Sequence, residues 1–195
     1  MAAEDSRDAV LDAARVAFHS RGYAKTTMKG VAMAAGVAPS VLRKYYDSKE
    51  QMFAAAMRLP FDPSRSVPEL LSPGLEGMGE RLVRATFEVL DDDDARQEIV
   101  ELFQAGASAG EAAQSLREFF EEAIVDRVAS IAGVPDARMR AALISSHLIG
   151  LAATRYAVRL EPLASLSEDQ VVRIYAPMIQ ELLDPTRPIA GLSQG

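Results

Sequence analysis

Hydrophobic residues recur at intervals of three or four along most of the chain, which is the spacing of one face of an α-helix. In the first such segment the apolar positions are Val10, Ala14, Ala17 and Phe18. No segment shows the sustained alternation of apolar and polar residues that a half-buried strand requires. Alanine, leucine, glutamate and arginine, which favour helices, are abundant throughout. The pattern therefore predicts an all-α protein.

Capping residues, glycines and prolines set the limits of the predicted helices. Gly22 follows the first helix, Gly36 follows the second, and Ser48 with Gln51 forms a capping box at the start of the fourth. The stretch 60–74 contains four prolines and is predicted to be a loop. Pro177 is expected to kink the last helix. The predicted helices are 6–21, 27–35, 39–46, 48–59, 75–91, 95–107, 108–132, 135–160 and 167–183.

Composition excludes several classes of protein. The 195-residue chain has no cysteine, so it has no disulfide, thiolate metal site or cysteine nucleophile. Its longest segment without a charged side chain is the 14 residues between Arg140 and Arg155, fewer than the roughly 20 of a transmembrane helix. The N-terminus is acidic and has no apolar signal sequence, so we expect a cytoplasmic protein without membrane contact. The aspartates at 91–94 are expected to form a solvated turn, with no metal or other cofactor.

Charge is distributed unevenly along the chain. The formal net charge is −7, yet residues 1–55 carry a net +2 and include all four lysines, whereas residues 56–195 carry −9. Cations gather in the segment AAGVAPSVLRKYYDSKE, where Arg43, Lys44 and Lys49 flank two tyrosines. This asymmetry favours a polyanion-binding module joined to a body that does not bind polyanions.

Two short helices joined by a glycine turn make the same segment a helix-turn-helix candidate. Ala32 and Ala35 are small enough to let the helices cross closely, and Gly36 can adopt the positive φ of the turn. The residues expected to face inward are Val31, Val37, Leu42 and Tyr45, and those expected to face outward are Pro39, Ser40, Arg43, Lys44 and Tyr46. In this motif the N-terminal residues of the second helix meet base edges in the major groove. Lys49, at the start of the next helix, is expected to bind a phosphate.

The segment GYAKTTMKGVAMAAGVAPSVLRKYYDSKEQMF resembles the N-terminal domain of the tetracycline-repressor (TetR) family. The shared motifs include Gly22-Tyr23, Thr26-Thr27, Ala35-Gly36-Val37 and Ser48-Lys49-Glu50. The resemblance implies a nine-helix protein with a helix-turn-helix DNA-binding domain at 1–58, its motif at about 28–47, and an effector-binding and dimerisation domain at 59–195. It also implies a bacterial-type homodimeric repressor that an apolar small-molecule effector releases from a palindromic double-stranded DNA operator.

Residue by residue, the resemblance places the DNA contacts on the second, third and fourth helices. The predicted DNA-binding residues are Thr27, Lys29, Pro39, Ser40, Arg43, Lys44, Tyr45 and Lys49. Two positions depart from the family pattern, because Ala38 stands where a serine cap is common and Arg43 where a tyrosine is usual. Arginine can read guanine through two hydrogen bonds or bind a phosphate, so the sequence leaves the role of Arg43 open.

The C-terminal part is predicted to hold an effector pocket and a dimer interface. The predicted pocket residues are Phe87, Glu101, Phe103, His147 and Arg155, each of which could equally belong to a packed core or an interface. The last two long helices carry wide apolar faces that suit a dimer interface. The residues predicted for it are Leu148, Leu151, Ala152, Tyr156, Val171, Ile174, Tyr175, Met178 and Leu182.

Two other function classes remain open from the sequence. A helical adaptor, or a ligand-independent regulator that has lost its pocket, would use the same apolar faces to bind another protein. An all-helical enzyme is the third class, but the chain has only two histidines, His19 and His147, and no nucleophile–base spacing, so we predict no enzymatic activity. Salt-dependent binding to a palindromic site would separate a DNA-binding regulator from both.

Overall fold

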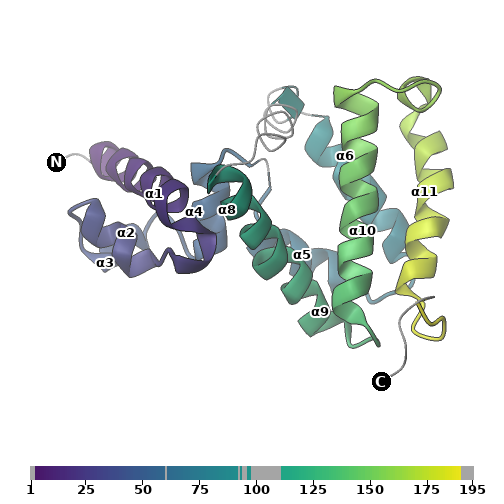
Figure 1. Cartoon of the computed structure of the whole chain (residues 1–195), viewed down its shortest axis with the longest axis horizontal. Coiled ribbons are helices and arrows are strands. Elements are labelled where there is room, and N and C mark those ends of the chain that lie inside the picture. Colours follow the sequence, from purple (N-terminus) through teal and green to yellow (C-terminus); the bar gives the residue numbers. More distant parts are fainter. Residues whose placement is uncertain (1–2, 60, 92, 94–95, 98–110, 190–195) are drawn as a thin grey trace. The chain divides into compact units, whose positions relative to one another are not determined.

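The computed structural model describes residues 3–59, 61–91, 93, 96–97 and 111–189, and every regular element in these ranges is helical (Figure 1). This confirms the predicted all-α class. The chain divides into two compact units, a first unit of residues 1–66 and 101–123 and a second unit of residues 67–100 and 124–195. Within the described ranges, no helix has both the length and the apolar character needed to span a bilayer.

The first unit combines the N-terminal helices with one helix from much later in the chain. Its helices are α1 (Ala3–Lys25), α2 (Met28–Ala34), α3 (Pro39–Leu42), α4 (Lys49–Ala56) and α8 (Glu111–Phe119). The Thr27 side chain caps α2 by accepting from the backbone N–H of Gly30 at 3.1 Å, and Ser48 caps α4 by accepting from Gln51 at 3.0 Å. The predicted starts of these two helices are thereby confirmed.

Four buried aromatic rings form the centre of the first unit. The Phe53 and Phe119 rings stack with centroids 4.4 Å apart, and Phe18 and Tyr23 meet Phe53 edge-on at 4.8 and 5.1 Å. All four side chains are almost fully buried. Because Phe119 belongs to α8, the core of this unit is not built from the N-terminal helices alone.

The second unit is a helical bundle in which α10 (Ala137–Ala152) and α11 (Glu168–Leu183) lie side by side (Figure 1). Its other α-helices are α6 (Met78–Leu90) and α9 (Asp126–Ala132). Turns of π-helix, η1 (Phe120–Val125) and η2 (Ala153–Ala157), precede α9 and follow α10, and a 3-10 turn, η3 (Leu163–Ser165), precedes α11. The most buried core residues are Met78, Val83, Phe87, Leu151, Val171, Val172, Ile179 and Leu183.

The proline-rich stretch predicted to be a loop instead contains a helix, α5 (Pro63–Leu71). Asp62 caps it, because its carboxylate accepts from the backbone N–H of Ser64 at 2.9 Å and its carbonyl accepts from Ser66. Pro63 occupies the first turn, where a missing N–H has no cost, and Pro68 forfeits a single hydrogen bond. The loop prediction is wrong because it counted prolines without their helix positions.

Other boundaries differ in detail. Gly22 breaks the first helix with a non-helical φ of 80° and ψ of 170°, as predicted, and a further helical turn continues beyond it to Lys25 within α1. The third helix stops at Leu42 instead of 46. The single helix expected at 108–132 is described from residue 111 as α8, η1 and α9 in succession. The helix expected at 95–107 lies almost wholly outside the described residues.

Candidate nucleic-acid interface

A tight turn joins α2 to α3 as the helix-turn-helix prediction requires. Gly36 has a φ of 68°, a left-handed conformation that glycine adopts without strain. The backbone N–H of Val37 donates to the Ala32 carbonyl at 3.0 Å, which closes the C-terminal end of α2. Ala38 has no side-chain oxygen to cap α3, and Pro39 starts that helix with its φ already fixed.

The two adjacent tyrosines have positions opposite to those predicted. Tyr46 is 3% exposed and belongs to the core, whereas Tyr45 is half-buried. After α3 ends, Lys44 and Tyr45 each donate to the carbonyl three residues earlier, at 3.1 and 3.0 Å. Tyr46 itself donates to the Leu42 carbonyl four residues earlier, at 3.1 Å, so its side chain shares the face of the buried Leu42. Burial raises the pKa of the Tyr46 phenol above its ordinary value, with the nearby Arg7 charge acting in the opposite direction.

Most of the predicted DNA-binding residues lie on the surface of the first unit, at the start of α2, on α3 and directly after α3. The exposed members are Thr27, Lys29, Pro39, Ser40, Arg43 and Lys44, with Tyr45 half-buried beside them. Three of these side chains are cations, which suit phosphate oxygens and guanine edges. The structure therefore gathers most of the predicted set on the helix-turn-helix.

Lys49 is the exception, because its ammonium points into the first unit. It donates to the Tyr23 carbonyl at 3.0 Å, lies 3.5 Å from the Glu122 carboxylate and sits 3.8 Å above the centre of the Tyr23 ring. Its side chain is 22% exposed. The structure thus gives Lys49 intramolecular partners, and its phosphate contact stays a prediction. This partnership joins residues distant in sequence, so the local capping pattern could not reveal it.

A second long-range contact lies close to Lys49. The Glu118 carboxylate accepts from the backbone N–H of Ala24 at 2.9 Å. This bond, followed by one from the Gln114 side chain, lowers the pKa of Glu118 below its ordinary value. Sequence reasoning did not identify Glu118, because its partner is a backbone group 94 residues away that carries no sequence signal.

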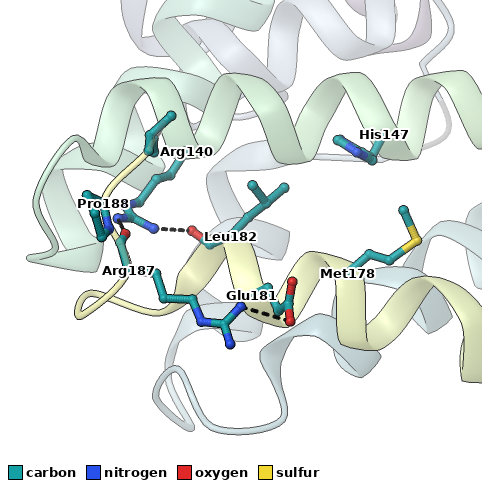
Figure 2. Close-up of a pocket in the computed structure, with 8 residues that line it drawn as sticks. Arg140, His147, Met178, Glu181, Leu182, Arg187 and Pro188 are labelled. Carbon is teal, nitrogen blue, oxygen red and sulfur yellow. Dashed lines mark hydrogen bonds and ion pairs between the residues drawn. The ribbon is translucent and has the colours of Figure 1, made fainter. Parts of the chain in front are cut away.

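The predicted effector-pocket residues do not all come together in the second unit. The Phe87 side chain is buried in the core, and the Arg155 guanidinium lies 5.5 Å from its ring centre while donating to the carbonyls of Leu163 and Leu166. His147 instead lines a groove of about 350 Å³ between α10 and α11, opposite Met178 (Figure 2). Neither Phe87 nor Arg155 is among the described residues lining this groove. Glu101 and Phe103 lie outside the described residues.

A buried arginine forms one end of that groove. Arg140 is 2% exposed, and its guanidinium donates to the Leu182 carbonyl at 2.7 Å (Figure 2). It also donates to the carbonyls of Pro135 at 2.8 Å and Arg187 at 2.5 Å. It therefore holds the C-terminal end of α11 and the residues after it against the start of α10. No sequence pattern predicts this role, because all three acceptors are backbone carbonyls.

The predicted dimer residues divide into a buried set and an exposed set. Leu151, Ala152 and Val171 are buried in the chain's own second unit, so the structure assigns them to that core rather than to a second chain. Ile174 and Met178 are 49% and 46% exposed on α11. The residues of intermediate exposure are Leu148, Tyr156, Tyr175 and Leu182. A second chain could therefore contact Ile174, Met178 and the partly exposed residues around them.

Comparison with known families finds two matches along the chain. Residues 10–56 match the family described as bacterial regulatory proteins, tetR family. Residues 76–183 match the family described as tetracyclin repressor-like, C-terminal domain. The second match alone covers more than half of the chain. No protein of curated function matched the chain.

Solved structures of similar proteins include a TetR-family regulator from Streptomyces coelicolor, with 33% identity over 92% of this chain and 95% of that one, at a TM-score of 0.48. A protein described as a TetR-family transcriptional regulator from Mesorhizobium loti is 20% identical over 94% and 97% of the two chains, at a TM-score of 0.51. NalD, described as the secondary repressor of a multidrug efflux pump in Pseudomonas aeruginosa, is 19% identical over 91% and 95%, at a TM-score of 0.47.

Proposed function

The chain belongs to the TetR family of bacterial regulatory proteins and is a DNA-binding transcriptional regulator, and we propose that it is a homodimeric repressor which a small molecule releases from a palindromic operator. The observation that carries the proposal is the exposed row of residues on the helix-turn-helix. Pro39 and Ser40 lie on α3, Arg43 and Lys44 follow directly after it, and Lys29 lies in the first turn of α2. These are the positions from which such a motif reads base edges and binds phosphates.

A palindromic operator follows if the protein is a symmetric dimer, because each subunit then reads one half-site. Support for self-association comes from α11, where Ile174 and Met178 expose large apolar side chains close to the groove that His147 lines. Apolar side chains of this size, half-exposed and neighbouring on one helix face, suit burial against a second copy. Both residues belong to the second unit.

The effector step rests on family membership and on the mixed chemistry around Phe87 and Arg155. A ligand-independent regulator is the second candidate. One observation favours it: Arg155 already donates two hydrogen bonds to backbone carbonyls, at 2.8 and 2.7 Å, and Phe87 is buried in the core. A ligand that uses these groups must therefore displace existing contacts, at a cost in binding free energy.

Selection of bound sequences from random DNA tests the proposal directly. We expect the full chain to enrich a two-fold symmetric sequence, with an affinity that falls steeply as salt rises. A small-molecule panel screened for release of that duplex then separates the two candidates, because a ligand-independent regulator responds to none of the compounds. Failure to enrich any sequence would contradict sequence-specific DNA binding.

A further inference from the structure

The break in α1 at Gly22 leaves the backbone N–H groups that follow it without intrahelical hydrogen-bond acceptors. With φ at 80° and ψ at 170°, Gly22 ends the regular part of α1, and the residues after it begin a new helical turn. The first N–H groups of any helical turn have no intrahelical acceptor. The N–H of Ala24 is one of these, and the Glu118 carboxylate of α8 accepts from it at 2.9 Å. Glu118 therefore acts as an N-cap supplied from a distant helix.

The approach of Glu118 is close enough to constrain the sequence at the break. A Cβ placed on Gly22 would lie 2.7 Å from a carboxylate oxygen of Glu118, so a larger residue there would push the carboxylate away. The positive φ also disfavours any other residue. Glycine at this position therefore permits both the bend and the approach of the carboxylate.

The residues after the break lead directly into the DNA-binding surface. The buried Thr26 hydroxyl donates to the Gly22 carbonyl at 2.7 Å, and the Thr26 N–H donates to the Tyr23 carbonyl at 3.1 Å. These bonds hold residues 22–26 in a compact turn, called here the 22–26 turn. The next residue, Thr27, is the N-cap of α2 and is exposed beside Lys29. The position of the 22–26 turn therefore sets where α2 begins.

Two neighbours of Glu118 fasten the same segment. Phe119 is fully buried and lies 5.4 Å from the Tyr23 ring, centre to centre. Glu122 lies 3.5 Å from the Lys49 ammonium, which itself donates to the Tyr23 carbonyl. The stretch 118–122 thus contacts both the 22–26 turn and the start of α4. It lies outside the 10–56 segment that matches the DNA-binding family domain.

We infer that Glu118 is a positioning residue for DNA recognition. By accepting from the Ala24 N–H it fixes the 22–26 turn, and with it the start of α2 on the DNA-binding surface. The inference rests on the proposed sequence-specific function. Glu118 need not touch DNA for this role. Its loss should weaken binding to a preferred sequence, which depends on the placement of α2 and α3, more than binding to DNA in general.

Fluorescence anisotropy of the full chain tests the inference with two duplexes of equal length, one selected from random DNA by the wild-type protein and one of random sequence. Glu118→Ala is compared with Glu121→Ala, which removes the same charge from an exposed neighbouring position. We expect Glu118→Ala to bind the selected duplex about tenfold more weakly than the Glu121 variant, equivalent to one charge-assisted hydrogen bond. The two variants should bind the random duplex equally.

Conservative variants separate the hydrogen bond from charge and folding. Glu118→Gln keeps an oxygen that can accept from Ala24 and should restore binding to the selected duplex. Glu118→Asp keeps the charge but withdraws the carboxylate by one methylene, so it should show the loss even if Glu118→Ala does not fold. Equal binding by the Glu118→Asp and wild-type proteins, or no rescue by Glu118→Gln, would overturn the inference. Failure of the wild-type protein to select any duplex would overturn the proposed function as well.

Discussion

The backbone N–H of Gly79 donates to the Gln180 side-chain oxygen at 2.9 Å, at a point where α6 and α11 approach so closely that a Cβ on Gly79 would lie 2.3 Å from the Ala176 carbonyl oxygen. The Gln180 amide group also donates to the Leu75 carbonyl at 2.9 Å. Gly79 lies in the first turn of α6, where its N–H has no intrahelical acceptor. One glutamine therefore caps α6 from α11, and glycine makes that contact possible.

Gly79→Ala should destabilise the second unit. The new methyl group meets backbone rather than a movable side chain, so we expect a steric cost of about 3 kcal/mol. The higher helix propensity of alanine returns about 1 kcal/mol, which leaves a net loss of about 2 kcal/mol. For a chain of this length, Tm should fall by roughly 4–8 °C. Thermal unfolding followed by circular dichroism measures the change, and an unchanged Tm would show that the two helices can separate at no cost.

Gly150→Ala is the matched substitution in α10. Among the described residues, no atom lies within 4 Å of a Cβ placed on Gly150, so the variant should gain about 1 kcal/mol from helix propensity. If a second chain packs closely against α10 at this point, the same methyl group would weaken the dimer. Sedimentation at several protein concentrations distinguishes the two results, and we expect a stabilised protein with unchanged self-association.

Met178→Glu should prevent self-association without unfolding the chain. The side chain is 46% exposed on α11, so a single chain can solvate the new carboxylate, whereas an apolar interface would bury it without a partner. Light scattering should give a monomer mass, with the helical circular dichroism unchanged. Leu151→Glu is the contrasting variant, because Leu151 is 1% exposed and the charge should lower Tm at every protein concentration. A wild-type protein that is monomeric at tens of micromolar would contradict the dimer proposal.

Asp91 and Glu168 form an acidic pair that should make stability depend on pH. Desolvation, followed by the Asp91 charge and a hydrogen bond with Asp91, raises the pKa of Glu168 above its ordinary value, and Arg155 opposes the shift. A carboxyl with a raised pKa binds its proton more tightly in the folded chain, so the unfavourable effect is present above the folded pKa and disappears as pH falls below it. Asp91→Asn should therefore raise Tm at pH 7–8, by an amount that shrinks in the acidic range.

The control for this pH effect is Glu88→Gln. Glu88 is exposed in the last turn of α6, next to the Asp91 cap, so its neutralisation gives a similar gain from the helix dipole but none from the Glu168 pair. A double-mutant cycle with Glu168→Gln should show coupling for Asp91 and none for Glu88. Equal gains from the two single substitutions, without coupling to Glu168, would refute the paired-acid explanation.

Local chemistry explains which parts of the fold the sequence could predict. Three helices are capped by Thr27, Ser48 and Ser167, each of which accepts from the backbone N–H three residues later. The capping residue and its hydrogen-bond partner therefore lie within four residues of sequence, where a local pattern can reveal them. Asp62 and Pro63 carry an equally local signal for α5, since an aspartate cap followed by a proline in the first turn is typical of a helix start. The inward position of Tyr46 carries a local signal too, because it stands four residues after the inward-facing Leu42, at the spacing of one helix face.

Long-range contacts explain most of what the sequence did not predict. An apolar stripe on α10 marks Leu151 as buried, but it does not say whether the burying surface belongs to the same chain or to a second one. Glu118 and Arg140 bind backbone atoms, which are alike at every position and therefore leave no pattern to read. The inward position of Lys49 likewise depends on Glu122, a partner visible only once the first unit is assembled.

Arg43 departs from the tyrosine that is usual at this position in the family. Arg43 is exposed directly after the last helical residue of α3, one turn beyond Pro39, so its long side chain can reach a guanine edge or a phosphate. We expect it to read guanine, because the short Ser40 side chain one turn earlier leaves room to approach the groove floor.

Arg43→Lys keeps the charge but removes the two-pronged geometry that binds the O6 and N7 atoms of guanine. Assayed against every single-base variant of the selected operator, it should lose about 1–3 kcal/mol of discrimination at one symmetric pair of positions and leave the other positions unchanged. Lys44→Arg, on the adjacent exposed residue, is the control and should alter affinity without moving that preference. An Arg43→Lys profile identical to wild type, with uniformly weaker binding, would instead identify Arg43 as a phosphate contact, because phosphate contacts add affinity without reading sequence.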